Sequence, residues 1–344
     1  MPDARIQSIG RAVPERRIAQ QDLLVHSPWK RSPLLDRLFL DSPVHSRGFF
    51  VPPEFYATPR TLTETNAAWL QGALLLGGRA VTEALARAGR APDEVDLFAV
   101  TTVTGYATPG LDLLLARQEG FRADFARAHF NCVGCHAAVP LLKVAADHVR
   151  LRPGSTALAL AVEVCSACFS ERDAPENLVA TALFGDGAAC ATVGTGGSGP
   201  LLLDFASRYD FEHLHTLGFD LDALGFRIIL DPAIPDLVAS HIEATVDDLL
   251  VRSGVKREDV VLWALHPGGS RILEAVGQAL RLDDDAMAPS RRVLRSHGNM
   301  SSPSVLFSLA EGLRSAGVPE RGYGVMAAFG PGLGIEVALL GFGR

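Results

Sequence analysis

Long apolar runs, cysteine pairs and blocks of basic residues are scarce in this sequence of 344 residues. The longest apolar stretch, residues 156–169, is interrupted by Glu163 and is shorter than the ~18 residues that a membrane-spanning helix needs. Residues 1–18 lack the apolar core of a signal peptide. Five cysteines are too few, and odd in number, for a disulfide framework. We therefore expect a cytoplasmic protein without a membrane segment.

Basic residues are outnumbered, with 32 Lys and Arg against 39 Asp and Glu, which gives a net charge of −7. This balance argues against broad binding of nucleic acid or anionic lipid, but it allows a small cationic mouth for a phosphorylated ligand. With 48% hydrophobic and 21% charged residues, the chain has the composition of a globular protein. The GxGxxG, GxxxxGK[ST], HExxH and EF-hand patterns are missing, as are paired acid–base carboxylates, so none of these motifs indicates a nucleotide, calcium or zinc-protease site.

The sequence does contain an internal repeat. Residues 81–101 align without a gap on residues 246–266, at a shift of 165 set by Gly89 and Gly254, and seven of the 21 pairs are identical. Both copies predict an amphipathic helix that ends at the glycine, then an acidic turn and a buried strand.

Two further matches follow in the same order. Residues 134–150 match residues 298–314 at a shift of 164, and each copy is a glycine turn that opens into a helix. Residues 182–193 match residues 327–340 at a shift of only 145. The second copy should therefore be shorter just before this third match.

Three matches in one order predict two halves of the same topology, residues 1–195 and residues 196–344. Strands and helices alternate in both halves, and the strands are near-continuous apolar runs, as expected for strands buried on both faces. Packed together, the halves would make an α/β protein of five layers, α/β/α/β/α, with a pseudo-two-fold axis. The proline-rich segment 28–61 is expected to be an irregular cover on this core.

The repeat also indicates a candidate site. Cys135 and Asn299 occupy matching positions before matching helices, and His266 ends the repeated strand where its counterpart is Thr101. Open α/β folds bind ligands at such strand ends and helix N-termini. A thiol at a helix N-terminus should have a lowered pKa, more so beside an imidazolium, and would suit an acyl-carrying nucleophile. His266 and Asn299 can both donate an N–H to an oxyanion or enolate.

Each of these residues also has a purely structural explanation. An isolated cysteine such as Cys135 is usually a buried core residue. His266 could be a hydrogen-bonded core or surface histidine, and Asn299 could cap the helix that follows it.

The cysteines offer another alternative. Cys132 with Cys135 and Cys165 with Cys168 form two CxxC pairs, a pattern that can bind zinc or form a redox pair. Their separation is longer than in zinc ribbons, the second pair follows a buried-strand pattern, and zinc would occupy the proposed nucleophile. We therefore expect no metal, and we expect Cys190 in the core.

Together these motifs resemble the type III polyketide synthases, the chalcone and stilbene synthase family of thiolase-like condensing enzymes. Their order and spacing match from about residue 90 to the end of the chain. The resemblance implies the family's duplicated five-layered thiolase-like fold and no resident cofactor. It is carried by GCHAA around Cys135, TALFGDGAA around Phe184, WALHPGGSRIL around His266, HGNMSSPSVLF around Asn299 and FGPGLGIE near the C-terminus.

The resemblance also implies roles for residues. Cys135 would take the starter acyl group from coenzyme A while His266 assists thiolate formation. His266 and Asn299 would hold the malonyl thioester carbonyl as carbon dioxide leaves. Phe184 and Phe226 match the family's two gatekeepers of the cavity.

Other implied roles concern partners. Thr108 falls where the family inserts a residue into the partner subunit's cavity, which implies a homodimer. The coenzyme A tunnel would be bordered by Gly268, Gly269 and Arg271, with cationic contacts from Arg47 and from the earlier Arg31 and Arg37. The chain departs from the family at His136-Ala137-Ala138, where a variable residue and Ala-Gly are common, and at His45, where a Lys is often found.

The expected function is iterative decarboxylative Claisen condensation of malonyl-CoA onto an acyl-CoA starter. The product would be a pyrone, a resorcinol or a related aromatic compound. One alternative is a ketoacyl synthase III-like enzyme that performs a single condensation with acyl carrier protein. Others are a non-catalytic thiolase-like binding subunit and a zinc-stabilised scaffold.

Overall fold

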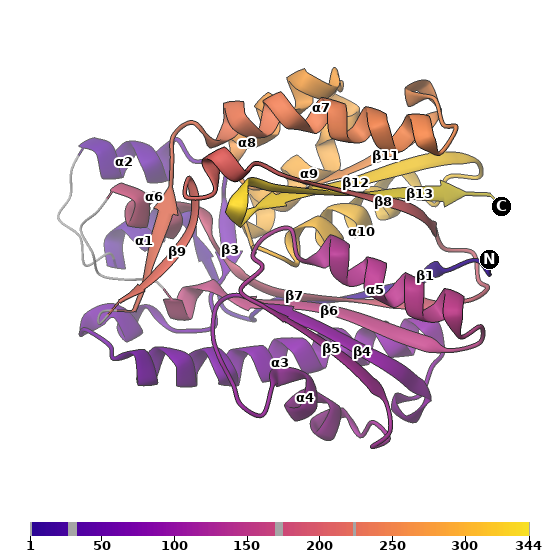
Figure 1. The fold of residues 1–344 in the computed structure, drawn as a ribbon. Helices are drawn as coiled ribbons and strands as arrows, with labels where there is room; N and C mark the ends of the chain where they lie inside the picture. The colour runs from indigo at the N-terminus through magenta and orange to yellow at the C-terminus, as the bar shows by residue number, and fades with distance from the viewer. Residues whose placement is uncertain (1, 27–32, 169–174, 223–224, 344) are drawn as a thin grey trace.

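The computed structural model describes residues 2–26, 33–168, 175–222 and 225–343. Two β-sheets form its frame, with helices between them and on their outer faces (Figure 1). None of the helices in these ranges is both long and apolar enough to cross a membrane.

The first sheet has five strands. Their spatial order is β1 (Arg5–Ala12), β7 (Asp186–Gly194), β6 (Thr156–Val164), β4 (Val95–Thr102) and β5 (Ala126–Asn131). β1 pairs antiparallel with β7, and β7 with β6, whereas β4 runs parallel to both of its neighbours. β6 and β7 are buried along their whole length, which explains their near-continuous apolar sequence.

The second sheet repeats this pattern with four strands. Their spatial order is β8 (Leu201–Tyr209), β13 (Gly334–Phe342), β12 (Gly322–Gly330) and β11 (Val260–Leu265). β8 pairs antiparallel with β13, and β13 with β12, whereas β12 and β11 run parallel. The two sheets are continuous where Arg5 of β1 pairs with Leu201 of β8, so that their nine strands form one hydrogen-bonded series. The matching pairings confirm the predicted duplication of one topology.

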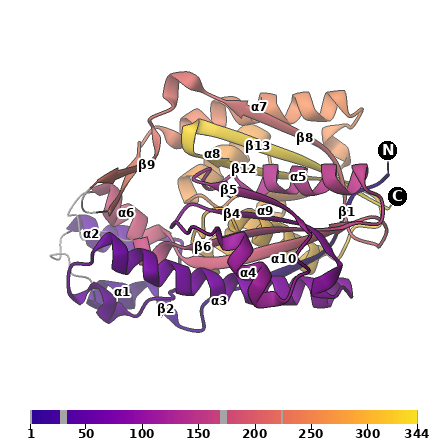
Figure 2. The same ribbon diagram turned by 60° about the horizontal axis from the view of Figure 1, so that its bottom comes forward.

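Helices complete five layers. α3 (Leu62–Ala88) and α4 (Leu111–Glu119) cover the outer face of the first sheet, and Figure 2 shows both in front of it. α7 (Ile234–Arg252) and α8 (Ser270–Leu280) cover the second sheet. α5 (Ala138–Leu151) and α10 (Ser304–Ala316) lie between the sheets, and α9 (Asp284–His297) flanks β11 and α10. Three separate apolar cores fill the spaces between these layers, which confirms the α/β/α/β/α order.

Local signals explain the first repeat. α3 begins at a capping box in which Thr61 and Glu64 exchange side-chain and backbone hydrogen bonds. It ends at Gly89, whose φ of 64° a glycine adopts without strain, and the equivalent Gly254 after α7 has a φ of 65°. β4 and β11 follow these two glycines as predicted.

The smaller shift of the third match has a simple cause. Between β6 and β7 the chain inserts a 3-10 turn (Cys165–Cys168) and α6 (Pro175–Leu183). β12 and β13 are instead joined by a tight turn at Pro331–Leu333. The second half is therefore shorter at this point, as the sequence predicts.

The prediction of an irregular segment 28–61 is wrong in part. Its described residues include α2 (Pro33–Leu40) and β3 (Ser46–Gly48), which pairs with β2 (Arg17–Ala19), and a 3-10 turn at Pro53–Ala57. α1 (Gln20–His26) precedes it. These elements share a small apolar core with α6, formed by Ile18, Leu23, Phe39, Phe49, Leu178 and Ala182.

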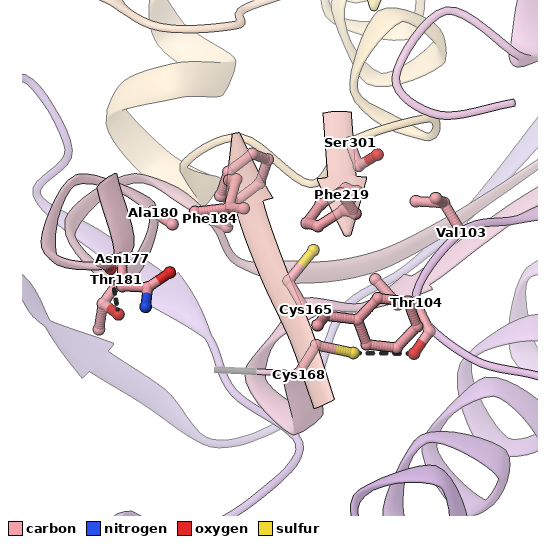
Figure 3. A pocket seen from close by; sticks show the side chains of 12 residues that line it. Val103, Thr104, Cys165, Cys168, Asn177, Ala180, Thr181, Phe184, Phe219 and Ser301 are labelled. Atoms are coloured by element: carbon pink, nitrogen blue, oxygen red, sulfur yellow. Dashed lines mark hydrogen bonds between the residues drawn. The ribbon is translucent and has the colours of Figure 1, made fainter. Parts of the chain in front are cut away.

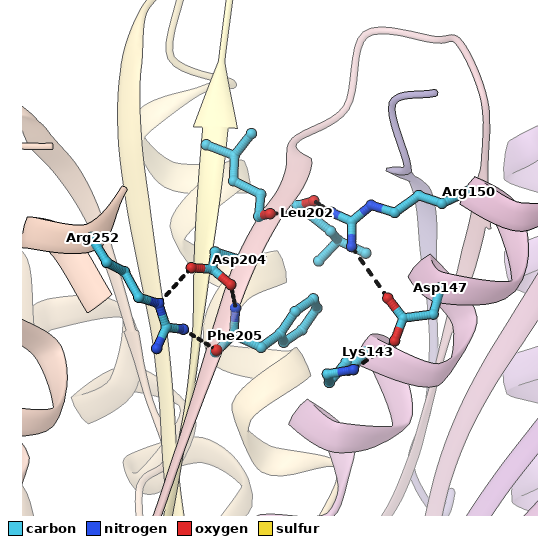
Figure 4. A network of polar contacts seen from close by, with 8 residues as sticks. Lys143, Asp147, Arg150, Leu202, Asp204, Phe205 and Arg252 are labelled. Carbon is cyan, nitrogen blue, oxygen red and sulfur yellow. Dashed lines mark hydrogen bonds and ion pairs between the residues drawn. The ribbon is translucent and has the colours of Figure 1, made fainter. Parts of the chain in front are cut away.

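Polar contacts hold β8 from both sides, and those on one side join the two halves (Figure 4). From α5 of the first half, Arg150 donates hydrogen bonds to the carbonyls of Leu202 and Leu203, the latter at 3.1 Å. From α7, Arg252 donates to the carboxylate of Asp204 at 2.7 Å and to the carbonyl of Phe205. The first strand of the second half is thus held by a helix from each half.

Candidate active site

Cys135 lies in the turn between β5 and α5, three residues before the helix begins at Ala138. Gly134 shapes this turn with a φ of 93°, and its carbonyl accepts a hydrogen bond from Ala137 N–H (3.0 Å). The Cys135 thiol accepts a hydrogen bond from the hydroxyl of Ser301, with Oγ and Sγ 3.3 Å apart. The cysteine of the first half therefore faces the second half.

Asn299 lies in the equivalent turn before α10. Its Oδ1 accepts a hydrogen bond from Ser301 N–H (2.7 Å), and its Nδ2 donates to the Gly268 carbonyl (3.3 Å). Because α10 begins only at Ser304, Asn299 does not cap the helix. One N–H of the carboxamide is free of these two contacts.

His266 directly follows β11 and is 1% exposed. Its N–H donates to the Ala327 carbonyl (2.9 Å), and its carbonyl accepts from Gly268 N–H (2.9 Å). The imidazole packs edge-on against Phe329, with ring centroids 5.6 Å apart, and its Nδ1 is buried without a hydrogen-bond partner. Packing against Phe329 therefore holds the ring, and no hydrogen bond is recorded for its Nδ1.

A chain of contacts links these three residues. It runs from the Cys135 sulfur through Ser301 to the Asn299 side chain, and from there through the Gly268 carbonyl to the turn after His266. The structure thus brings together Cys135, His266 and Asn299, which the sequence separates by up to 164 residues.

Burial sets the protonation of the site. It raises the pKa of the Cys135 thiol to about 12, although the Ser301 hydrogen bond acts in the opposite direction. It also lowers the pKa of His266 to about 3. The resting pair is a neutral thiol and a neutral imidazole, so the predicted lowering of the thiol pKa by a neighbouring imidazolium is wrong for the resting site.

Glu163 on β6 is a site residue that sequence analysis missed, although its position inside an apolar run was visible. It is fully buried, and its Oε2 accepts hydrogen bonds from Val103 N–H (2.9 Å) and the Thr104 hydroxyl (2.8 Å). Its Oε1 accepts from the Ser302 hydroxyl (2.6 Å), one residue beyond Ser301. Burial raises its pKa to about 7.

A small cavity of about 40 Å³ lies beside the site (Figure 3). Ser301 lines it, so it adjoins the nucleophile. Phe184 lies before β7, whereas Phe219 and Phe226 come from the hairpin of β9 (Leu217–Asp222) and β10 (Gly225–Leu230). Cys168 closes the opposite end, where its thiol donates to the Thr104 carbonyl (2.8 Å).

The cavity wall includes both residues that match the family's gatekeepers, Phe184 and Phe226. A second cavity of about 340 Å³ shares Val103, Phe219 and Phe226 with the first. Thr108 is exposed on the loop between β4 and α4 and is not part of either wall.

A separate groove of about 380 Å³ begins at Gly268, two residues after His266. Gly268, Gly269 and Arg271 line it, as does Arg37 of α2. Leu183 is also in its wall, and the Leu183 carbonyl accepts a hydrogen bond from Asn299 N–H (2.9 Å). The groove therefore reaches the backbone of the site. Arg31 falls outside the described residues.

The position of Arg47 contradicts the prediction that this residue contacts coenzyme A. Its side chain is completely buried, and its guanidinium donates to the Phe184 carbonyl (2.8 Å) and to Oε1 of Gln20 (2.6 Å). A phosphate in solvent cannot reach it. The motif had indicated a cation near the groove but not which way the side chain points.

Other residues singled out in the sequence have structural contacts. His136 is buried with its ring against Tyr209 (6.4 Å), and burial lowers its pKa to about 4. Cys190 is buried in β7, and the exposed Cys132 contacts the Tyr106 hydroxyl (3.1 Å). Within the described residues, no three His, Cys, Asp or Glu side chains are placed to hold a metal ion.

Known protein families match most of the chain. The N-terminal domain of chalcone and stilbene synthases matches residues 53–197, and the C-terminal domain matches residues 213–341. A 1,3,6,8-tetrahydroxynaphthalene synthase of Streptomyces peucetius subsp. caesius is 36% identical over 97% of this chain and 92% of its own length. A 3,5-dihydroxyphenylacetyl-CoA synthase of Streptomyces toyocaensis is 34% identical over 98% and 90%.

Solved structures agree with the sequence matches. PKS-I of the brown alga Ectocarpus siliculosus superposes with a TM-score of 0.93 at 26% identity, covering 99% of both chains. The 1,3,6,8-tetrahydroxynaphthalene synthase of Streptomyces coelicolor A3(2), a bacterial type III polyketide synthase, gives a TM-score of 0.92 at 27% identity over the full length of both. The chain therefore belongs to the chalcone and stilbene synthase family and is a type III polyketide synthase, an acyltransferase that condenses malonyl-CoA onto an acyl-CoA starter.

Proposed function

We propose that Cys135, His266 and Asn299 carry out the condensation in this chain. The observation that carries the proposal is the chain of contacts that joins the three residues in one buried site between the halves. Together they supply a nucleophile, a base and N–H donors for an oxyanion. The side chains thus provide the chemistry of the reaction without a resident cofactor.

Loading of the starter begins with a neutral pair. As an acyl-CoA arrives, His266 takes the thiol proton and the Cys135 sulfur attacks the thioester carbonyl carbon. The carbon–sulfur bond to coenzyme A breaks, and the leaving thiolate takes the proton from the His266 imidazolium. Burial favours the neutral form of both groups, so loading starts from the thiol and the neutral imidazole.

Extension uses the other two side chains. The thioester carbonyl of malonyl-CoA accepts hydrogen bonds from the neutral imidazole of His266 and the free N–H of Asn299. Carbon dioxide leaves, and the electron pair of the broken bond forms an enolate that the two donors stabilise. The enolate carbon attacks the acyl group on Cys135, which releases the cysteine thiolate and leaves the lengthened chain on coenzyme A. Transfer of this chain back to the Cys135 sulfur, with release of coenzyme A, begins another round.

We infer an aromatic polyketide, a pyrone or a resorcinol, as the product. The products of two relatives support this inference, because tetrahydroxynaphthalene and dihydroxyphenylacetyl groups are aromatic. The aromatic wall of Phe184, Phe219 and Phe226 suits a planar product. Reacting a panel of acyl-CoA starters with malonyl-CoA and weighing the products will identify the starter and the number of extensions.

We also propose a cytoplasmic homodimer. The five cysteines are free, as in proteins of reducing compartments. Thr108 projects from an exposed loop next to the cavity residues Val103 and Thr104, which suits insertion into a partner subunit. Light scattering should give twice the mass of one chain, and a monomer at assay concentration would contradict the proposal.

Acylation of Cys135 tests the proposed function directly. After incubation with an acyl-CoA, we expect the mass of the acyl group on the peptide that contains Cys135, and Cys135→Ala should lose both this mass and all condensed product. Cys132→Ser is the matched control, because Cys132 is an exposed thiol three residues away and should leave acylation unchanged. Product formation by Cys135→Ala at the parent rate would overturn the assignment.

A further inference from the structure

Arg47 of β3 is a buried cation whose role neither the reaction nor the family match explains. Burial lowers its pKa to about 9, so the guanidinium remains charged at neutral pH. It lies over the ring of Phe49, 5.3 Å from its centroid. Its two terminal nitrogens donate to the Phe184 carbonyl (2.8 Å) and to Oε1 of Gln20 (2.6 Å). Because burying a charge costs free energy unless the charge is hydrogen-bonded, these hydrogen bonds are needed to keep the guanidinium in the protein interior.

The Phe184 carbonyl belongs to a segment that holds Asn299. Asn299 N–H donates to the Leu183 carbonyl (2.9 Å), and Gly185 N–H donates to the Asn299 carbonyl (2.9 Å). These two bonds form a parallel bridge between Phe184 and Asn299. Arg47 thus binds the middle residue of the three that fix the Asn299 backbone.

The aliphatic part of Arg47 packs between the same two segments. A Cβ at Gly185 would lie 3.1 Å from Cβ of Arg47 and 2.5 Å from the His297 carbonyl oxygen. A Cβ at Gly298 would lie 3.4 Å from Cδ of Arg47 and 2.5 Å from the Leu183 carbonyl oxygen. Both glycines are needed because the segments approach so closely, and Arg47 occupies the space beside them.

We propose that Arg47 is a positioning residue that fixes Asn299 and Phe184 through the bridge at Leu183–Gly185, and that it does not bind coenzyme A. The inference rests on the proposed role of Asn299 in decarboxylation. Gln20 extends the arrangement, because its Nε2 donates to the Ala182 carbonyl (2.8 Å) at the end of α6. Arg47 and Gln20 therefore hold consecutive parts of residues 182–185.

An arginine suits this position better than a lysine. The planar guanidinium presents several N–H donors in fixed directions, so it can serve the carbonyl and the amide oxygen together. An ammonium group is a point charge on a flexible stem and cannot keep the same two-acceptor geometry. Arg47→Lys should thus retain the charge and most of the stem but weaken the bridge, whereas Arg47→Met keeps only the stem.

The test separates positioning from substrate binding. Decarboxylation of malonyl-CoA reports on Asn299, and acylation of Cys135 by a starter acyl-CoA does not need Asn299. For Arg47→Met we expect kcat of decarboxylation to fall by about ten- to a hundredfold, with Arg47→Lys in between. The KM for malonyl-CoA and the rate of Cys135 acylation should stay within about twofold of the parent. Arg150→Lys is the matched control, because Arg150 also donates to backbone carbonyls but lies at the far end of α5.

Three results would overturn the proposal. An unchanged kcat in both Arg47 variants would show that the bridge holds without Arg47. A raised KM with an unchanged kcat would show a contact to coenzyme A. Equal losses of acylation and decarboxylation, matching the loss of folded protein by circular dichroism, would show a structural role only. If Arg47→Met does not fold, the same measurements on Arg47→Lys decide the question. Failure of the parent enzyme to decarboxylate malonyl-CoA would instead contradict the proposed function.

Discussion

At the scale of single residues, burial decides the electrostatics of this site. A helix N-terminus stabilises a negative charge by about 0.3–1 kcal/mol, whereas complete burial can shift a pKa by 3–5 units, each about 1.4 kcal/mol. His266, which is 1% exposed, shows the larger effect, since burial moves its pKa to about 3, and burial also raises the pKa of the half-buried Cys135 to about 12. The sequence places Cys135 before a helix but does not show how deeply the site is buried. The direction of the predicted pKa shift of the Cys135 thiol is therefore wrong, although the structure does bring Cys135, His266 and Asn299 together.

At Glu163, the effect of burial on a pKa can be measured as a change in folding stability with pH. Its pKa is raised by burial from 4.5 to about 7, so between these pH values the folded protein keeps a proton that the unfolded chain has lost. Folding stability attributable to Glu163 must therefore fall as the pH rises from about 4.5 to about 7, by up to about 3 kcal/mol. Glu163→Gln cannot ionise, and its amide oxygen can still accept from the donors of Val103 and Thr104. We expect the variant to become more stable relative to the parent as the pH rises.

Urea unfolding of both proteins at pH 5 and pH 8 measures this difference. Other buried carboxyls such as Asp186 titrate in both proteins, so only the difference between parent and variant reports on Glu163. If the unfolding free energies of parent and variant differ by the same amount at both pH values, burial does not raise the pKa of Glu163.

At the scale of elements, the parts set by local sequence could be predicted and the long-range contacts could not. The helix that ends at Gly89 or Gly254 and the strand after it are encoded within about 20 residues, so the repeat revealed both copies. The 3-10 turn and α6, which are inserted before β7, were visible in the sequence only as the smaller shift of the third repeat match. The side chain of Arg47 turns inward because Gln20 and Phe184, 27 and 137 positions away, supply acceptors. No local pattern contains that information.

The turn after β12 shows how closely the two halves meet at the nucleophile. Gly330 has a φ of −170°, which any residue can adopt, so space and not backbone strain requires glycine. A Cβ at Gly330 would overlap Nδ1 of His136 and lie 3.1 Å from the backbone nitrogen of Cys135. Gly330→Ala must push the two turns apart, at a cost of about 1–3 kcal/mol in stability. We expect kcat to fall by about tenfold or more, because Cys135 moves relative to Asn299.

Gly254→Ala provides the control for this prediction. A Cβ at Gly254 would meet nothing within 4 Å, so the substitution adds only the strain of a φ of 65°, about 1–2 kcal/mol. Unfolding curves and kcat should therefore separate the two variants, with a loss of stability in both and a loss of kcat only in Gly330→Ala. Equal kcat values in both variants would show that the turn does not position Cys135.

At the scale of the whole molecule, an acidic protein must bind an anionic substrate. The net charge of −7 disfavours coenzyme A at long range, and the groove that begins at Gly268 itself contains Asp41 and Asp231. Among the residues that the structure describes, Arg37 and Arg271 are the cations in its wall, and both are exposed. With Arg47 buried, we propose that these exposed arginines provide the attraction for the phosphates. Binding through them should be weak, sensitive to salt and separate from catalysis.

Arg271→Glu tests this arrangement. The substitution replaces an attraction to the coenzyme A phosphates with a repulsion, and exposed charge pairs are individually weak, so we expect KM for malonyl-CoA to rise by about three- to tenfold while kcat stays unchanged. The difference from the parent should shrink in 0.5 M salt, where the screening length is only about 4 Å. Malonyl-pantetheine carries the thioester without the nucleotide phosphates, so its KM should be nearly the same for variant and parent. An equal rise in KM for both substrates would mean that Arg271 shapes the groove near the thioester, and the cationic mouth would then have to be sought elsewhere on the surface.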